Sequence, residues 1–181
     1  MSNAAVLGCN IGWFLHDHLH DTLPVDLEVD LIIVDFGVND ANLEKFGGNL
    51  NDVRLEHEAL ISYVRNKMTH KPAILYAESF IPPGQVRSAP SKASNMAEVH
   101  AAAARKYDVP MVSFRDAVWP NQEDPTLAAH LWGRGVHPGW QLHQLFADVL
   151  VYFIQKSYAR FLEEHGLRSR PRAQDNESPL L

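Results

Sequence analysis

The strongest constraint on the fold is a short aliphatic run, residues 30–36, which is closed by Gly37. A continuous apolar run of this length predicts a strand that is buried on both faces of a sheet. Two weaker runs, residues 73–77 and 110–114, each follow a segment with helical spacing. Strands that alternate with helices are typical of a parallel sheet, so we predict an α/β fold.

Helical spacing of apolar residues is visible in four segments. Residues 52–68 and 95–106 lie between the predicted strands, and residues 11–23 precede the first of them. Residues 4–7 could form the end of a further strand. The last helix has the broadest apolar stripe, and we expect it to cover one face of the sheet. This stripe consists of Leu142, Leu145, Phe146, Val149, Leu150, Phe153 and Ile154.

Composition narrows the possible functions. With 181 residues, 46% of them hydrophobic, the chain suits one globular domain, which we place at residues 1–167. Residues 168–181 are rich in Arg, Pro and Ser and are predicted to be a disordered tail.

The net charge of −6 and the lack of a basic stripe argue against a nucleic-acid partner. No apolar run approaches the roughly 18 residues of a membrane span, and the single Cys9 excludes an intramolecular disulfide.

Two short polar segments are candidates for chemistry. Residues 37–40, Gly-Val-Asn-Asp, follow the first predicted strand, and ligands of open α/β sheets bind beyond the carboxyl ends of strands. Residues 135–139, Gly-Val-His-Pro-Gly, immediately precede the last helix. Either segment taken alone could be structural: the first a strand-to-helix turn, the second a loop that begins a helix. Their occurrence in one chain favours a functional interpretation.

The order and spacing of these segments resemble blocks III and V of the SGNH/GDSL hydrolase family. Residues 3–8, followed by a predicted helix, are similar to block II of the same family. The resemblance implies a flavodoxin-like, three-layer α/β/α fold with a parallel sheet of strand order 2-1-3-4-5. It also implies a carboxylic ester hydrolase that acts on a small-molecule, carbohydrate or lipid acyl ester and needs no metal or other cofactor.

The resemblance assigns roles to individual residues. Asn39 would donate a side-chain N–H, and Gly8 a backbone N–H, to the oxyanion of a tetrahedral intermediate. His137 would be the general base that activates a serine hydroxyl and then protonates the leaving group. Asp40 would shape the turn around Asn39 and would not act as a catalytic acid.

Two parts of the family pattern are missing. No Gly-Asp-Ser, the block that carries the nucleophile on the first strand, occurs in the chain, and Ser2 has no strand before it. Arg134 stands three residues before His137, where the family has the aspartate that orients the histidine; Glu123 or Asp124 could replace it. We therefore expect a truncated chain that is inactive as given, in which residues 30–36 lack a neighbouring strand on one side. The alternative is a non-catalytic binding protein that keeps the pocket.

Other features of the sequence are weaker indications of function. His16 and His20 stand four apart on a predicted helix and could share a metal ion, but an exposed polar face explains them better. Trp119, Trp132 and Trp140 could line an acyl or sugar pocket, although packing is the commoner role of such residues. A flavodoxin-like nucleotide-binding domain is disfavoured because no glycine-rich phosphate loop follows a predicted strand.

Overall fold

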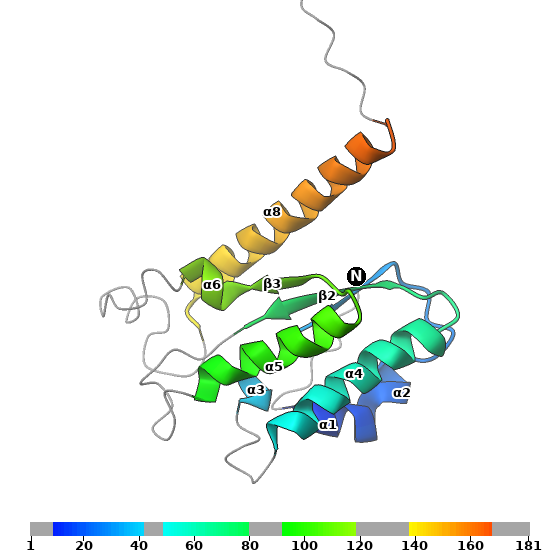
Figure 1. The fold of residues 1–181 in the computed structure, drawn as a ribbon, viewed down its shortest axis with the longest axis vertical. Coiled ribbons are helices and arrows are strands. Elements are labelled where there is room, and N and C mark those ends of the chain that lie inside the picture. Colours follow the sequence, from blue (N-terminus) through cyan, green and yellow to red (C-terminus); the bar gives the residue numbers. More distant parts are fainter. Residues whose placement is uncertain (1–8, 42–48, 80–91, 119–137, 168–181) are drawn as a thin grey trace, which may run out of the picture.

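The computed structural model describes residues 9–41, 49–79, 92–118 and 138–167, with the backbone alone at 92–95 and 118 (Figure 1). The predicted tail and the possible strand at residues 4–7 lie outside these ranges.

The sheet has three parallel strands in the order β1-β2-β3. They are β1 (Leu31–Val34), β2 (Ala73–Glu78) and β3 (Met111–Ser113). Ile33 of β1 pairs with Leu75 of β2, and Tyr76 of β2 pairs with Met111 of β3. The three predicted strands are thus present, and the α/β class with a parallel sheet is confirmed.

Strand β1 is an edge strand among the residues that the structure describes. The prediction that this run is buried on both faces is wrong, because Leu31 and Ile33 are 40% and 48% exposed. Their face belongs to the same side of the sheet as Leu75, which pairs with Ile33.

One face of the sheet is covered by the helices that precede and follow β2 (Figure 1). They are α4 (Leu50–Asn66) and α5 (Lys92–Lys106), which lie within three residues of the predicted ends. The cap of α4 is Asn49, whose side chain accepts a hydrogen bond from the backbone N–H of Asn51 at 2.9 Å. This satisfies one of the free donors in the first turn.

The predicted helix 11–23 is present but is divided by a π-helical turn. Its parts are α1 (Ile11–Trp13), the π-helix η1 (Phe14–His18) and α2 (Leu19–Thr22). Asn10 caps it by accepting from the backbone N–H of Trp13 at 2.8 Å. Phe14 and Leu19 are buried, and Leu15 packs partly against the core.

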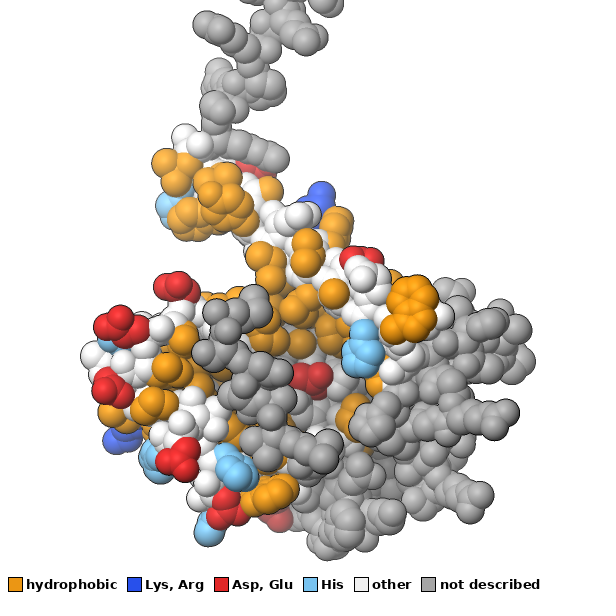
Figure 2. Space-filling model, turned by 180° about the vertical axis from the view of Figure 1, so that it is seen from behind, with side chains coloured by type: hydrophobic (Ala, Val, Ile, Leu, Met, Phe, Trp, Pro, Cys, Tyr) orange, Lys and Arg blue, Asp and Glu red, His pale blue; other side chains and the backbone are white. Residues whose placement is uncertain are grey.

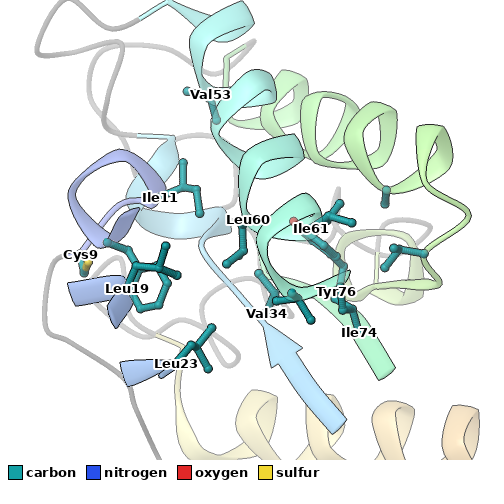
Figure 3. Packing of buried hydrophobic residues seen from close by; sticks show 14 of the residues in the cluster. Cys9, Ile11, Leu19, Leu23, Val34, Val53, Leu60, Ile61, Ile74 and Tyr76 are labelled. Carbon is teal, nitrogen blue, oxygen red and sulfur yellow. The ribbon is translucent and has the colours of Figure 1, made fainter. Parts of the chain in front are cut away.

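The main core lies between these helices and the sheet (Figure 3). Its buried apolar side chains come from the amino-terminal helices, from α4 and α5, and from the facing side of β1 and β2. They include Ile11, Phe14, Leu19, Val34, Val53, Leu60, Ile61, Val64, Ile74, Tyr76 and Met96. The carboxyl ends of the strands continue into two short helices, α3 (Gly37–Asp40) after β1 and α6 (Phe114–Val118) after β3.

The opposite face is covered by α8 (Trp140–Glu164). Leu142 is fully buried against β2 and β3, and the ring of Phe146 stacks on that of Phe114 at 4.0 Å. The predicted stripe is confirmed except at Ile154, which is 41% exposed because α8 extends past the sheet (Figure 1). No described helix, α8 included, is long and apolar enough to cross a membrane.

Candidate functional site

The Gly-Val-Asn-Asp segment forms the short helix α3 at the carboxyl end of β1. The backbone N–H groups of Asn39 and Asp40 both donate to the carbonyl oxygen of Phe36, at 3.0 and 2.9 Å. This turn leaves Asn39 partly exposed while the next residue, Asp40, is fully buried. The two adjacent polar side chains therefore lie in different environments, one within reach of solvent and one in the core.

Gly37 holds this turn against the end of β2. A Cβ atom at this position would lie 2.2 Å from the carbonyl oxygen of Ser79 and 2.9 Å from a carboxylate oxygen of Glu78. The backbone N–H of Gly37 donates to Asp35 at 3.3 Å, and the hydroxyl of Ser79 donates to the same oxygen at 2.6 Å. Only glycine fits this approach of one backbone to another.

Asp40 connects α3 to three other elements. Its Oδ1 accepts the backbone N–H of Ile11, the first residue of α1, at 2.9 Å. Its Oδ2 lies 2.8 Å from Nε2 of His57 on α4 and 2.9 Å from Nε2 of His100 on α5. All three side chains have essentially no exposed surface. A carboxylate this deeply buried is stable only because each contact is a hydrogen bond.

The second ring nitrogen of each histidine is also paired. Nδ1 of His57 lies 2.9 Å from the hydroxyl of Tyr76, and Nδ1 of His100 lies 2.5 Å from Oε2 of Glu78. Both partners come from β2 and are buried. We call these five side chains, Asp40, His57, Tyr76, Glu78 and His100, the Asp40 network.

The two histidines of the network have pKa values shifted in opposite directions. Burial lowers the pKa of His57 to about 4, although the hydrogen bond to Asp40 opposes this shift. Burial also disfavours the charged form of His100, but its hydrogen bonds to Asp40 and Glu78 outweigh this and raise its pKa to about 9. For Asp40 the hydrogen bonds from His100 and His57 exceed the effect of burial and lower the carboxyl pKa. Near neutral pH the network therefore contains a carboxylate, an imidazolium and a neutral imidazole.

The same side chains are of types that bind metal ions. One ligand atom from each of Asp40, His57 and His100 lies within 4.8 Å of the others, the sole such group in the described ranges. The N···O distances of 2.8 and 2.9 Å are ordinary for hydrogen bonds, however, and each N–H has an acceptor. A zinc ion would displace both protons and would need a fourth ligand in a position without solvent. We therefore assign these residues to a hydrogen-bonded network.

Of the residues predicted for the site, the structure describes Asn39. Gly8 and His137 lie outside the described residues, as do Ser2 and Arg134. The described chain resumes at Cys9 after Gly8 and at Pro138 after His137. Ile11, three positions after Gly8, bonds to Asp40, and α8, which begins soon after His137, packs against α6 at the carboxyl end of β3.

The weaker sequence candidates have other surroundings. His16 is exposed and its Nδ1 lies 2.6 Å from a carboxylate oxygen of Asp17, while the ring of His20 contacts that of Tyr63. Trp140, the first residue of α8, is 74% exposed and is therefore not a core residue. Trp119 and Trp132 lie outside the described ranges, as do Glu123 and Asp124.

Sequence reasoning missed the histidines and the glutamate of the Asp40 network. A signal for the histidines was present, since each interrupts an apolar helical stripe. His57 stands between Val53 and Leu60 on α4, and His100 stands between Met96 and Ala104 on α5. A histidine inside such a stripe must find a buried partner.

The fold and the motifs agree with comparisons to known proteins. The GDSL-like lipase/acylhydrolase family matches residues 2–145 of the chain. A putative GDSL-like lipase from Parabacteroides merdae has a similar structure, with a TM-score of 0.61, 19% identity and coverage of 89% of this chain and 70% of that one. The M. smegmatis aryl esterase has a TM-score of 0.41 and 23% identity, and the match covers 57% of this chain and 52% of that one.

A search of curated proteins finds no match. The family match spans most of the chain and includes α3, whose turn carries Asn39. From this match, and from a parallel sheet with helices on both faces, it follows that the chain belongs to the GDSL-like lipase/acylhydrolase family, the SGNH hydrolases.

Proposed function

We propose that this chain serves SGNH-type hydrolysis of carboxylic esters, with Asn39 and Gly8 as donors to the oxyanion and His137 as general base. The observation that carries the proposal is the turn at the carboxyl end of β1. There Asn39 is partly exposed, and its neighbour Asp40 is buried and hydrogen-bonded. A donor held by a rigid turn is what stabilisation of a developing oxyanion requires.

The position of α8 supports the role proposed for His137. Pro138 and Gly139 directly precede α8, and α8 packs against α6 beyond the carboxyl end of β3. The same edge of the sheet carries α3 beyond β1. The start of α8 is therefore near the edge at which ligands of such sheets bind, which supports the role proposed for the preceding His137.

The chain of 181 residues contains no Gly-Asp-Ser segment. We therefore expect these residues alone to bind an acyl oxyanion or a product carboxylate without turning over an ester. Removing one oxyanion donor costs about 10²–10³ in rate, whereas removing the nucleophile of a serine hydrolase removes almost all covalent catalysis.

Binding can be tested on the chain as it is. A ¹⁵N-labelled sample is titrated with butyrate, whose carboxylate has the charge of the oxyanion. We expect saturable shifts of the Asn39 side-chain amide and of the Ala41 backbone amide in the same turn, and a much weaker response of the Ala41 amide in Asn39→Ala. Asn66→Ala is the matched control, because Asn66 is an exposed residue of α4 that donates to Ser62 at 3.1 Å. Titration curves that are the same in wild type and Asn39→Ala would exclude Asn39 as a donor.

Catalysis is tested with p-nitrophenyl acetate and a fluorophosphonate probe. We expect no release of p-nitrophenol above the buffer rate and no labelled serine. Labelling of a single serine, located by mass spectrometry, together with turnover lost in His137→Ala would show that the chain carries its own nucleophile.

A second candidate function is non-catalytic binding through the same pocket. It is favoured by two sequence observations, the absence of Gly-Asp-Ser and the presence of Arg134 where the family has an aspartate. The transcript sequence upstream of Met1 distinguishes the two. An in-frame strand that ends in Gly-Asp-Ser favours the enzyme, and His137→Ala in that longer chain is then the decisive variant. An in-frame stop codon favours the binding protein.

A further inference from the structure

The Asp40 network places charge and four hydrogen bonds in a core that would otherwise be apolar. Its histidines have no exposed surface and their ring centroids lie 4.1 Å apart. Buried charges are expensive unless every partner is in place. Both histidines bond to Asp40, the residue that follows Asn39.

The protons of the network can be assigned from its partners. Asp40 is acceptor-only when ionised, so both Nε2 atoms that face its Oδ2 carry a hydrogen. Nδ1 of His57 then accepts from the hydroxyl of Tyr76, which makes His57 neutral. Nδ1 of His100 faces a carboxylate oxygen of Glu78 and carries the second hydrogen of an imidazolium. With this assignment every donor has an acceptor.

Asp40 joins the two backbone segments that are proposed to supply oxyanion donors. It follows Asn39 directly in α3, and its Oδ1 holds the backbone N–H of Ile11, three residues after Gly8. Rotation of the Asp40 carboxylate would change both segments at once. The two histidines oppose this rotation because they fix Oδ2 from α4 and α5.

We infer that Asp40, held by hydrogen bonds from His57 and His100, is the positioning group that fixes the separation between Asn39 and the backbone of Ile11. The catalytic consequence of this inference rests on the proposed function, whereas its geometry can be tested without it. His57 and His100 are positioning residues, since they are buried and hydrogen-bond to Asp40.

The test compares amide hydrogen exchange in wild type, His100→Phe and His100→Gln. We expect the Ile11 amide to exchange at least about tenfold faster in His100→Phe, because Asp40 loses a charge-assisted donor. The Asn39 side-chain signal should also shift. The amide of Leu60, a buried residue in the middle of α4, reports global opening of the chain, and its exchange rate should rise less than that of the Ile11 amide. His100→Gln can still donate to Asp40, so it should restore part of the Ile11 protection.

The matched control is His70→Phe, since the His70 side chain is 44% exposed and lies 3.5 Å from Glu28, away from the network. It should leave the Ile11 amide and the Asn39 signal unchanged. Equal acceleration at Ile11 and Leu60 in His100→Phe, or no acceleration at either, would overturn the inference. If His100→Phe fails to fold, Asp40→Asn takes its place, with the same reporters and the same two outcomes.

Butyrate affinity separates this inference from the proposed function. If both hold, His100→Phe should weaken butyrate binding about tenfold, and His70→Phe should not change it. A wild-type chain that binds no butyrate contradicts the proposed function, while its Ile11 and Asn39 signals still decide the positioning role. A folded His100→Phe that binds butyrate like wild type contradicts the positioning role alone.

Discussion

The two faces of the sheet are packed in different ways. On the face covered by α4 and α5, buried apolar side chains form the main core (Figure 3). A charged network on the same face reaches α3. On the face covered by α8, the buried cluster is smaller and lies over β2 and β3. Hydrophobic side chains remain exposed along α8 (Figure 2). On β1, Leu31 and Ile33 are exposed.

This difference shows where the candidate site obtains its rigidity. The turn that carries Asn39 is fixed from the α4 and α5 face, by Gly37 against Ser79 and by Asp40 against His57. The α8 face contributes packing at β3 but has no described contact of this kind with α3. Substitutions on the first face should therefore disturb both stability and site, whereas substitutions at β1 on the second face should have little effect.

The largest effect is expected for Gly37→Ala. Its new Cβ would meet the backbone carbonyl of Ser79 at 2.2 Å, and neither backbone can move without breaking the turn. We expect a loss of about 4 kcal/mol in the free energy of unfolding, or about 10 °C in Tm, as measured by thermal denaturation. Gly12→Ala is the control, since its Cβ would meet the flexible side chain of Glu56 and should cost less than about 1 kcal/mol. Similar losses in the two variants would refute the close-approach argument.

The next comparison is between two leucines, one on each face. Leu60 of α4 is 2% exposed, whereas Leu150 of α8 is only partly buried. Leu60→Ala should cost about 3 kcal/mol, because it removes buried methyl groups and leaves a cavity. Leu150→Ala should cost about 1 kcal/mol, because water can fill part of the space. Urea denaturation measures both, and equal costs would mean that the α8 face is as well packed as the other.

The contributions of His57 and His100 to stability should be lost in different pH ranges. The pKa of His57 is about 4 in the folded chain against an ordinary value of 6.5. Its stabilising contribution is complete above pH 6.5 and is lost as the pH falls through 4. The pKa of His100 is about 9, so its contribution is complete below pH 6.5 and is lost as the pH rises through 9. These two groups together give a stability maximum near pH 6.5.

Substitutions can show which histidine causes the loss of stability on the acid side of the pH profile and which causes the loss on the alkaline side. His100→Phe should flatten the alkaline limb and His57→Phe the acid limb, each by about 3 kcal/mol, since each pKa lies about 2.5 units from 6.5 and one unit corresponds to about 1.4 kcal/mol. His70→Phe should keep both limbs, because His70 lies outside the network. Urea denaturation between pH 4 and 9 supplies the data. A wild-type profile that stays flat from pH 6.5 to 9 would mean that His100 is not held as an imidazolium.

Much of the fold could be predicted because its signals are local. The strands and the helices α4, α5 and α8 follow from apolar runs and helical stripes, and their ends differ by a few residues. The exposure of Ile33 depends on which strand lies beside β1, which is not a local property. The contact between Asp40 and His100 joins residues 60 positions apart, so no spacing rule could predict it. What the sequence offered was a histidine in each apolar stripe.

The smallest effect is expected at the exposed side of β1. Ile33 is 48% exposed on the α8 face, whereas its neighbour Ile32 packs partly against the main core. Ile33→Thr should change the free energy of unfolding by less than about 0.5 kcal/mol, because it removes little buried area and keeps a β-branched side chain. Ile32→Thr places a hydroxyl against the core and should cost about 1 kcal/mol or more. If Ile33→Thr proves as costly as Ile32→Thr, then Ile33 is covered in solution and the two faces of β1 are equally buried.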